Sequence, residues 1–162
     1  MQLPVPKLTP LSHNALKRRF IQFQIQEAFQ IAANSKSYTT PNLARWFRKN
    51  RKLGSRDRKV VSEIIYTMIR YQELFVHCGH KDPSSQLQAL EQQSPLSTKG
   101  NIQERLATHL SIPQWIVEEW YSTLGEETIT LAHFMQSIAT IDIRINAAKT
   151  TRHSVVQALE KA

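Results

Sequence analysis

Two short stretches of the chain carry side chains whose types and spacing could support chemistry, and the first is a candidate metal site. His77-Cys78-Gly79-His80 places two imidazoles and the chain's single thiol within four residues. A structural zinc site uses four such ligands, usually as two spaced pairs. This stretch offers at most three, and no second Cys/His pair lies near it in the sequence. We therefore interpret it as a helix end with a buried thiol, and keep metal binding as the alternative.

No stretch of the sequence carries a recognisable catalytic motif. Cys78 has no Cys-Xaa-Xaa-Cys or Pro-Cys context and no identifiable activating base, so it is a poor candidate nucleophile. The four glycines are isolated, which excludes a glycine-rich phosphate loop, and the six histidines have no catalytic spacing to acids. The residues therefore predict no catalytic, cofactor-binding or metal-binding site in this chain, and they favour a binding function.

The second stretch, residues 45–59, is a candidate polyanion surface. Eight cations fall within these fifteen residues and are opposed only by Asp57: Arg45, Arg48, Lys49, Arg51, Lys52, Arg56, Arg58 and Lys59. Like charges this close repel unless an anion neutralises them, and the helix start at Gly54–Ser55 adds backbone N–H donors suited to phosphate. We predict that these eight residues bind RNA. The alternatives are a solvated helix end and, for Arg58, a structural role tied to an acid.

The division of charge along the chain supports a localised anion-binding surface. Residues 1–70 hold 14 Lys and Arg against 3 Asp and Glu, whereas residues 71–162 hold 7 against 10. A basic half beside a mildly acidic half favours nucleic acid. An anionic membrane is the weaker alternative, because the cations do not follow one face of a single amphipathic helix. A helical DNA-binding domain is a further alternative.

Among the nearby aromatics, Trp46 could stack on bases, although helical spacing is more typical of a core residue.

Apolar periodicity predicts the helices that position this surface. The expected helices run from Ser12 for about five turns, from Thr40–Pro41 to Gly54, over 56–77 behind a Ser55 N-cap, over 82–90, and as several further helices after residue 101. Residues 91–100 are the best internal linker, or equally a surface loop. Residues 141–146 alternate apolar with polar and predict one strand, followed by a helix capped by Thr150 or Thr151.

The length of 162 residues bounds the chain to one domain, or to one and a part. The single cysteine excludes an internal disulfide and fits a reducing, cytoplasmic setting. The proline-containing N-terminus lacks the apolar segment of a signal peptide, and no apolar run approaches the ~20 residues of a membrane span. A lone strand cannot satisfy its own backbone groups, so this strand pairs with strands beyond residue 162, pairs with another chain, or does not form in isolation. We favour the first, and expect the chain to be the N-terminal part of a longer protein.

Two segments resemble one family. Residues 50–70 are similar to a segment in the N-terminal region of Sun-type (Nol/Nop/Sun) RNA cytosine-C5 methyltransferases, through Gly54-Ser55-Arg56-Asp57-Arg58, Tyr66 and Arg70. Residues 112–150 resemble the segment that precedes the catalytic domain in the same family, through Pro113, Trp115, Trp120, Gly125-Glu126-Glu127, Arg144-Ile145-Asn146 and Lys149. The two segments occur in the family's order.

The resemblance implies an all-α fold: a NusB-like helical RNA-binding bundle over residues 12–97, then a smaller helical segment over 98–162 that ends in one strand and one helix, the start of an α/β module. It implies methyl transfer from S-adenosylmethionine to cytosine C5 of ribosomal RNA, with RNA and a C-terminal methyltransferase domain in cis as partners. The catalytic cysteines and the cofactor loop of the family have no counterpart here, so the enzyme's activity and its cofactor would belong to residues beyond Ala162. The alternative is a free-standing NusB-like regulatory module.

Overall fold

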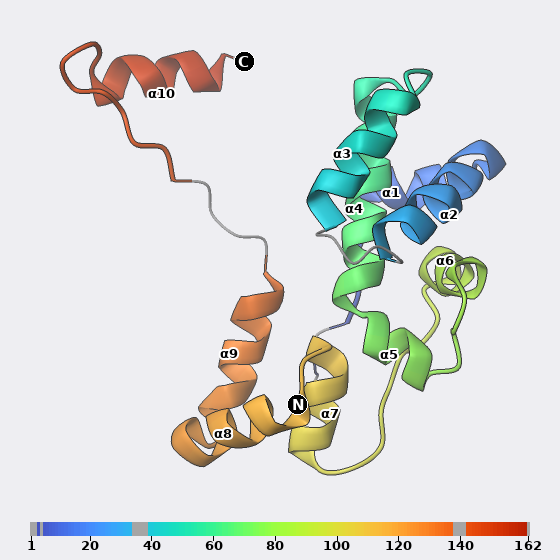
Figure 1. Cartoon of the computed structure of the whole chain (residues 1–162). Coiled ribbons are helices and arrows are strands. Elements are labelled where there is room, and N and C mark those ends of the chain that lie inside the picture. Colours follow the sequence, from blue (N-terminus) through green and yellow to red (C-terminus); the bar gives the residue numbers. More distant parts are fainter. Residues whose placement is uncertain (1–2, 4, 34–38, 138–141, 162) are drawn as a thin grey trace.

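The computed structural model describes residues 3, 5–33, 39–137 and 142–161, and the regular structure in these ranges is helical (Figure 1). The helices are α1 (Pro10–Leu16), α2 (Arg19–Ala33), α3 (Thr39–Lys49), α4 (Ser55–Arg70), α5 (Gln72–His77), α6 (Pro83–Gln92), α7 (Ile102–Leu110), α8 (Gln114–Leu124), α9 (Glu127–Gln136) and α10 (Arg152–Glu160). The helical class expected from the sequence is therefore confirmed for the described residues, whereas a NusB-like arrangement stays a prediction.

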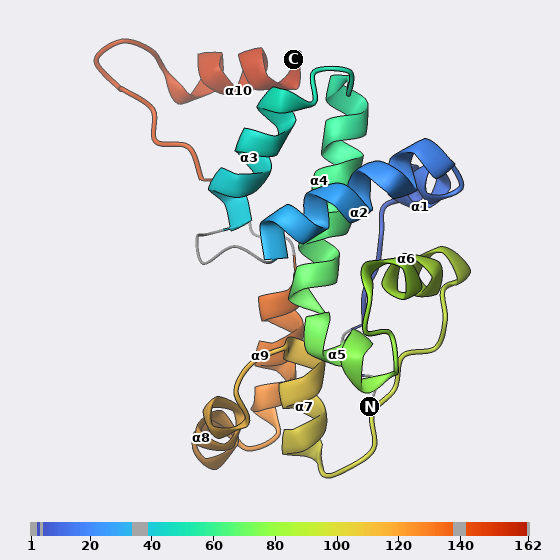
Figure 2. The same ribbon diagram turned by 45° about the vertical axis from the view of Figure 1, so that its right-hand side comes forward.

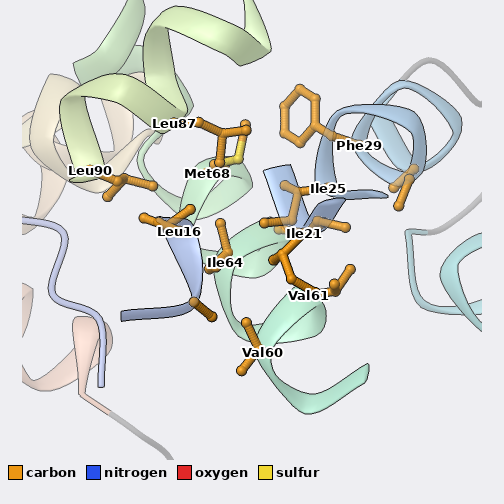
Figure 3. Close-up of a cluster of buried hydrophobic side chains, with 14 of the residues drawn as sticks. Leu16, Ile21, Ile25, Phe29, Val60, Val61, Ile64, Met68, Leu87 and Leu90 are labelled. Carbon is orange, nitrogen blue, oxygen red and sulfur yellow. The ribbon is translucent and has the colours of Figure 1, made fainter. Parts of the chain in front are cut away.

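Helix α4 is the centre of the larger core cluster. Its apolar residues recur at spacings of three and four and are fully buried, as Figure 3 shows for Val60, Val61, Ile64 and Met68 against side chains of α1, α2 and α6. Complete burial of one such side chain stabilises the fold by about 1.5–3 kcal/mol. Helices α1 and α2 pack directly on α4, while α3 packs mainly on α2, and α6 packs mainly on α1 and α2.

A second, smaller core cluster joins the N-terminal arm to the helices that follow the α6–α7 connection. Leu3 of the arm packs there with buried residues of α7, α8 and α9: Leu106, Ala107, Leu110, Val117, Ile129 and Ala132. The end of α7 also meets α5, where the Glu73 backbone N–H donates to Ser111 Oγ at 3.1 Å. The sequence predicts a domain boundary between residues 97 and 98. These two clusters do not test that boundary, which stays a prediction.

Two helices expected to be continuous are interrupted, so those predictions are wrong. The chain turns between α1 and α2 at Lys17 and Arg18, where the Arg18 N–H donates to the Ala15 carbonyl at 3.0 Å and Gln22 Nε2 donates to the Leu16 carbonyl. The long helix over 56–77 breaks at Tyr71, whose φ of −111° and ψ of 24° leave the helical region. Each break lets both flanking helices turn a buried face to the core.

The strand expected over residues 141–146 is not observed. Ile141 lies outside the described residues, and the described part, residues 142–146, has no regular structure. A strand needs a neighbour to accept its backbone hydrogen bonds, and no other strand exists among the described residues to supply one. The helix expected next is confirmed as α10, with Thr151 as its N-cap, and it lies apart from the other helices (Figure 1).

The carboxylate of Glu63 fastens the N-terminal arm to α4, which makes it a stability determinant. It accepts hydrogen bonds from the Thr9 N–H at 2.7 Å, from Thr9 Oγ1 at 2.9 Å and from Ser12 Oγ at 2.7 Å. Glu63→Ala leaves the fully buried Ser12 hydroxyl unpaired, which costs about 1–3 kcal/mol. Urea unfolding followed by circular dichroism measures this. Glu27→Ala, an exposed acid on α2, is the control and should stay within about 0.5 kcal/mol of the parent. Equal stabilities of the two variants would contradict the assigned role.

Asp82 caps α6 and makes that helix sensitive to acid. Its carboxylate accepts hydrogen bonds from Ser85, through the backbone N–H and the hydroxyl, and from the Ser84 N–H, and these bonds lower the pKa of Asp82. A carboxyl whose folded pKa is lowered stabilises the fold above its unfolded pKa of about 4 and loses that effect as pH falls through the folded value. Asp82→Asn keeps a capping side chain without a titrating group. We therefore expect the parent's advantage in thermal midpoint over this variant to shrink between about pH 5 and pH 2. A constant difference would show that Asp82 does not contribute in this way.

Candidate nucleic-acid interface

The structure brings the eight predicted RNA-binding residues to one corner of the molecule, at the end of α4 that begins with Ser55 (Figure 1). Arg45, Arg48 and Lys49 lie on the last turns of α3, two more cations lie in the α3–α4 turn, and three lie on the first turns of α4. Seven of the eight side chains are exposed, and Arg58 is half-buried. We call these eight residues the basic corner; their contact with RNA stays a prediction.

The α3–α4 turn holds the basic corner rigidly against the core. The Asn50 N–H donates to the Trp46 carbonyl at 3.0 Å, and the Leu53 N–H donates to the Asn50 carbonyl at 3.3 Å. Leu53 is only 2% exposed and belongs to the larger core cluster. Because Leu53 is anchored inward, Arg51 and Lys52, which precede it, are held in exposed positions.

Gly54, and not Ser55 as expected, is the N-cap of α4. Its φ of −67° and ψ of 168° are extended, and it contributes no side-chain hydrogen bond to the first turn. Ser55 is the first helical residue, and Asp57 lies in the first turn, where the helix dipole favours an acid. The first backbone N–H groups of α4 therefore have no side-chain cap and lie beside Arg56.

Trp46 is a core residue, so it is not placed to stack on bases. Its side chain is 3% exposed and lies edge-on to the ring of Phe47, with the ring centroids 5.2 Å apart. The indole Nε1 is buried and has no hydrogen-bond partner among the described residues. The exposed aromatic side chains of these helices include Phe20 and Phe23 on α2, at 53% and 62%, and Tyr66 on α4, at 38%.

Arg58 combines membership of the basic corner with a structural role. Its Nε donates to the Leu53 carbonyl at 2.9 Å, and its guanidinium lies 5.7 Å from the centroid of the Phe47 ring. The alternative raised by the sequence, a structural arginine, is therefore present, although its partner is a carbonyl and an aromatic face and not an acid. Arg58 links the turn to both α3 and α4.

Asp57, the only acid in residues 45–59, is paired with a cation outside the basic corner. Arg18 Nη2 lies 2.7 Å from Asp57 Oδ1, and this ion pair fixes the α1–α2 corner beside the start of α4. Lys17 and Arg19 flank Arg18 and are exposed, so they add two cations next to the basic corner. The sequence showed the run of Lys17, Arg18 and Arg19, but the break between α1 and α2 that places it here was not predicted. Figure 2 shows α2 crossing α4.

The cations of the basic corner have no acidic partners within the described ranges. Arg18–Asp57 is the one ion pair found there, and none of the eight residues takes part in it. Repulsion among neighbouring cations is reduced only by solvent and salt, with a screening length of about 8 Å at physiological ionic strength. The arrangement therefore favours a ligand that brings several negative charges at once.

A cavity of about 890 Å³ lies beside the basic corner, between α4, the N-terminal arm and α9. Lys59 of the basic corner lines it together with Lys7, Tyr66, Arg70 and Tyr71, and Glu63 is the one acid among the described lining residues. Burial raises the pKa of the Tyr71 phenol, and the charge of Arg70 partly opposes this effect, so the phenol is neutral near pH 7. The cavity offers cations and phenol groups close to the same surface.

The stretch His77–His80 is a helix end in the structure. Cys78 is half-buried against the larger core cluster, and its Sγ donates to the Ser97 carbonyl at 3.5 Å. The ring of His80 lies edge-on to Phe75. Among the described residues, no three His, Cys, Asp or Glu side chains lie close enough together to hold a metal ion.

Comparison with known protein families identifies a match in the C-terminal third of the chain. Residues 112–162 match the family described as the RsmF/B-like methyltransferase ferredoxin-like domain. The match covers α8, α9 and α10 and excludes the basic corner. It supports the expected relationship to a Sun-type RNA methyltransferase for these residues. Neither the search of curated proteins nor the search of solved structures found a match.

The two roles of Arg58 can be separated by comparison with its exposed neighbour. Arg58→Ala removes the hydrogen bond to the buried Leu53 residue and the interaction with the Phe47 ring, and we expect a loss of about 1–2 kcal/mol in unfolding free energy. Arg56→Ala, which removes the same charge from an exposed side chain, should change stability by less than about 0.5 kcal/mol. Chemical denaturation of both variants checks this, and equal effects would exclude a structural role for Arg58.

Proposed function

We propose that this chain is the RNA-holding N-terminal region of an S-adenosylmethionine-dependent ribosomal RNA (cytosine-C5) methyltransferase that acts in the cytoplasm. The observation that carries the proposal is the basic corner, a set of exposed cations without acidic partners among the described residues, in a chain whose residues 112–162 match a methyltransferase-associated domain. The chain binds RNA and presents it, and a catalytic domain in cis would hold the cofactor and carry out methyl transfer.

The fixed geometry of the basic corner favours a phosphate backbone over a membrane surface. Its cations lie on two helix ends and a tight turn, so they form a compact cluster and not a stripe along one helix. No helix within the described ranges is long and apolar enough to cross a membrane. The cavity lined by Lys59, Tyr66 and Arg70 adds groups that can hydrogen-bond and stack with an unpaired nucleotide.

The exposed apolar side chains of α8 and α9 are the proposed docking surface for the catalytic domain. Trp115 is 68% exposed and Phe134 is 75% exposed, and both belong to the segment that matches the ferredoxin-like domain. Large apolar side chains gathered in one segment are typical of a surface that another part of the protein covers.

Charge reversal of the basic corner tests the proposal. We expect the variant in which Arg51, Lys52, Arg56 and Lys59 are all Glu to bind ribosomal RNA at least about tenfold more weakly than the parent at near-physiological salt, because the side chains that neutralise phosphates are gone and fewer counterions are released on binding. Filter binding or fluorescence anisotropy measures the affinity. All four side chains are exposed, and circular dichroism should show an unchanged helical content.

A second variant controls for net charge. Lys81, Lys99, Arg144 and Arg152 are exposed and lie outside the basic corner, and their change to Glu alters the net charge equally. This control should keep most of its RNA affinity and its dependence on salt, whereas removing each phosphate-binding cation from the basic corner lowers the slope of log K against log salt by about 0.7–0.9. Equal loss of affinity in both variants would mean that only net charge matters. A preference for duplex DNA over structured RNA in competition would also overturn the RNA assignment.

A further inference from the structure

A second cavity lies on the other side of the N-terminal arm, away from the basic corner. It has a volume of about 630 Å³, within the range of small-molecule sites. The arm, the end of α6, the α6–α7 connection and α7 form its walls. Its apolar lining includes Leu3, Leu8, Leu90 and Leu96. The cavity therefore has apolar walls, and its remaining lining includes polar side chains.

The titratable groups that line this cavity are all basic. Lys7, His13, Arg105 and His109 contribute to the lining, and no Asp or Glu is among the described residues that do. At neutral pH the cavity thus contains two fixed positive charges and no negative one. A concave site with one sign of charge and apolar walls attracts counterions more strongly than an open surface does.

Two polar atoms of the lining are buried without a hydrogen-bond partner among the described residues. They are Arg105 Nε and Thr98 Oγ1. Arg105 also makes no ion pair in the described ranges. A buried guanidinium nitrogen without an acceptor is costly, and native proteins normally supply one. An acceptor from a bound ligand would satisfy Arg105 and Thr98 together.

We propose that this cavity binds the phosphate group of an organic monophosphate of nucleotide size. Arg105 and Thr98 donate hydrogen bonds to the phosphate, Lys7 adds positive charge, and the leucines pack against the organic part. A monophosphate carries a charge of about −1.5 to −2 near pH 7 and offers several acceptor oxygens, which suits these groups. The same chemistry is present in a free mononucleotide and in the 5′-terminal nucleotide of an RNA. The site shares Lys7 of the N-terminal arm with the cavity beside the basic corner, but none of the eight residues of the basic corner lines it, and it does not depend on their proposed function.

Thermal unfolding and calorimetry with defined probes test the site. Adenosine 5′-monophosphate should raise the thermal midpoint of the parent in a concentration-dependent way, because it binds only the folded state. Adenosine, which lacks the phosphate, should not. Two RNA oligonucleotides that differ only in a 5′-phosphate or a 5′-hydroxyl distinguish the two sources of the phosphate group. Tighter binding of the 5′-phosphate form identifies an RNA terminus as the ligand, and equal binding of the two identifies the free small molecule.

Arg105→Gln is the decisive variant. We expect at least tenfold weaker binding of the monophosphate and an unchanged or raised thermal midpoint without ligand, since Arg105 Nε has no hydrogen-bond partner to lose among the described residues. Arg152→Gln on α10, an exposed arginine outside the cavity, should bind as the parent does. A lower midpoint of Arg105→Gln without ligand would assign Arg105 a structural role and overturn the proposal.

Lys7→Gln is a second variant of the site. Lys7 is exposed, so its replacement should not change the stability of the fold. The variant should also bind the monophosphate more weakly. The variant with Glu at positions 51, 52, 56 and 59 should keep full monophosphate binding, which separates this site from the basic corner. No response of the parent to millimolar monophosphate, or equal affinity of the parent and the Arg105 and Lys7 variants, would overturn the proposal.

Discussion

The burial of one face of α4 is the interaction on which the rest of the structure depends. Val60, Ile64 and Met68 are completely buried, and α1, α2 and α6 cover them. Such a face stabilises the fold by several kcal/mol, which is comparable to the whole net stability of a typical domain. It also positions the polar features, since Glu63 reaches the arm from α4, and Asp57 in its first turn holds Arg18. Three cations of the basic corner thus lie on the first turns of the core helix, and the buried Leu53 places the turn that carries two more.

The sequence predicted the elements with strong local signals and missed those decided by tertiary packing. The cap at Asp82 with Pro83, the residues that α4 buries, and the position of the basic corner all follow from local patterns. The breaks at Lys17 and Tyr71 carry no glycine or proline, so nothing local marked them, and only the need of both flanking helices to reach the core explains them. The sequence left two roles open for Trp46, base stacking and core packing, and its burial shows that it is a core residue. The RNA contacts of the basic corner stay predictions, because a pattern of cations does not identify its ligand.

The C-terminal third shows how context limits a correct local pattern. Residues 142–146 alternate apolar with polar, yet they have no regular structure, because a strand exists only when a neighbour accepts its hydrogen bonds. The same residues fall within the match to a ferredoxin-like domain, an architecture built from both strands and helices. The exposed Trp115 and Phe134 are a second sign of incomplete packing in this segment. The alternation of apolar and polar residues therefore indicates that the segment favours a strand. The strand forms only where a neighbouring strand pairs with it.

The placement of charge on the two sides of the molecule reflects one physical trade-off. Cations held close together without acids lower the stability of the free protein, and the buried Leu53 fixes the turn that carries Arg51 and Lys52. A polyanion that binds only the folded form removes this repulsion and stabilises the fold by mass action. Arg105 follows the same logic on a smaller scale, since a buried nitrogen without an acceptor is tolerated only when the rest of the fold is stable enough to offset it. In both places, the strain that the free chain carries increases the free energy gained when an anion binds.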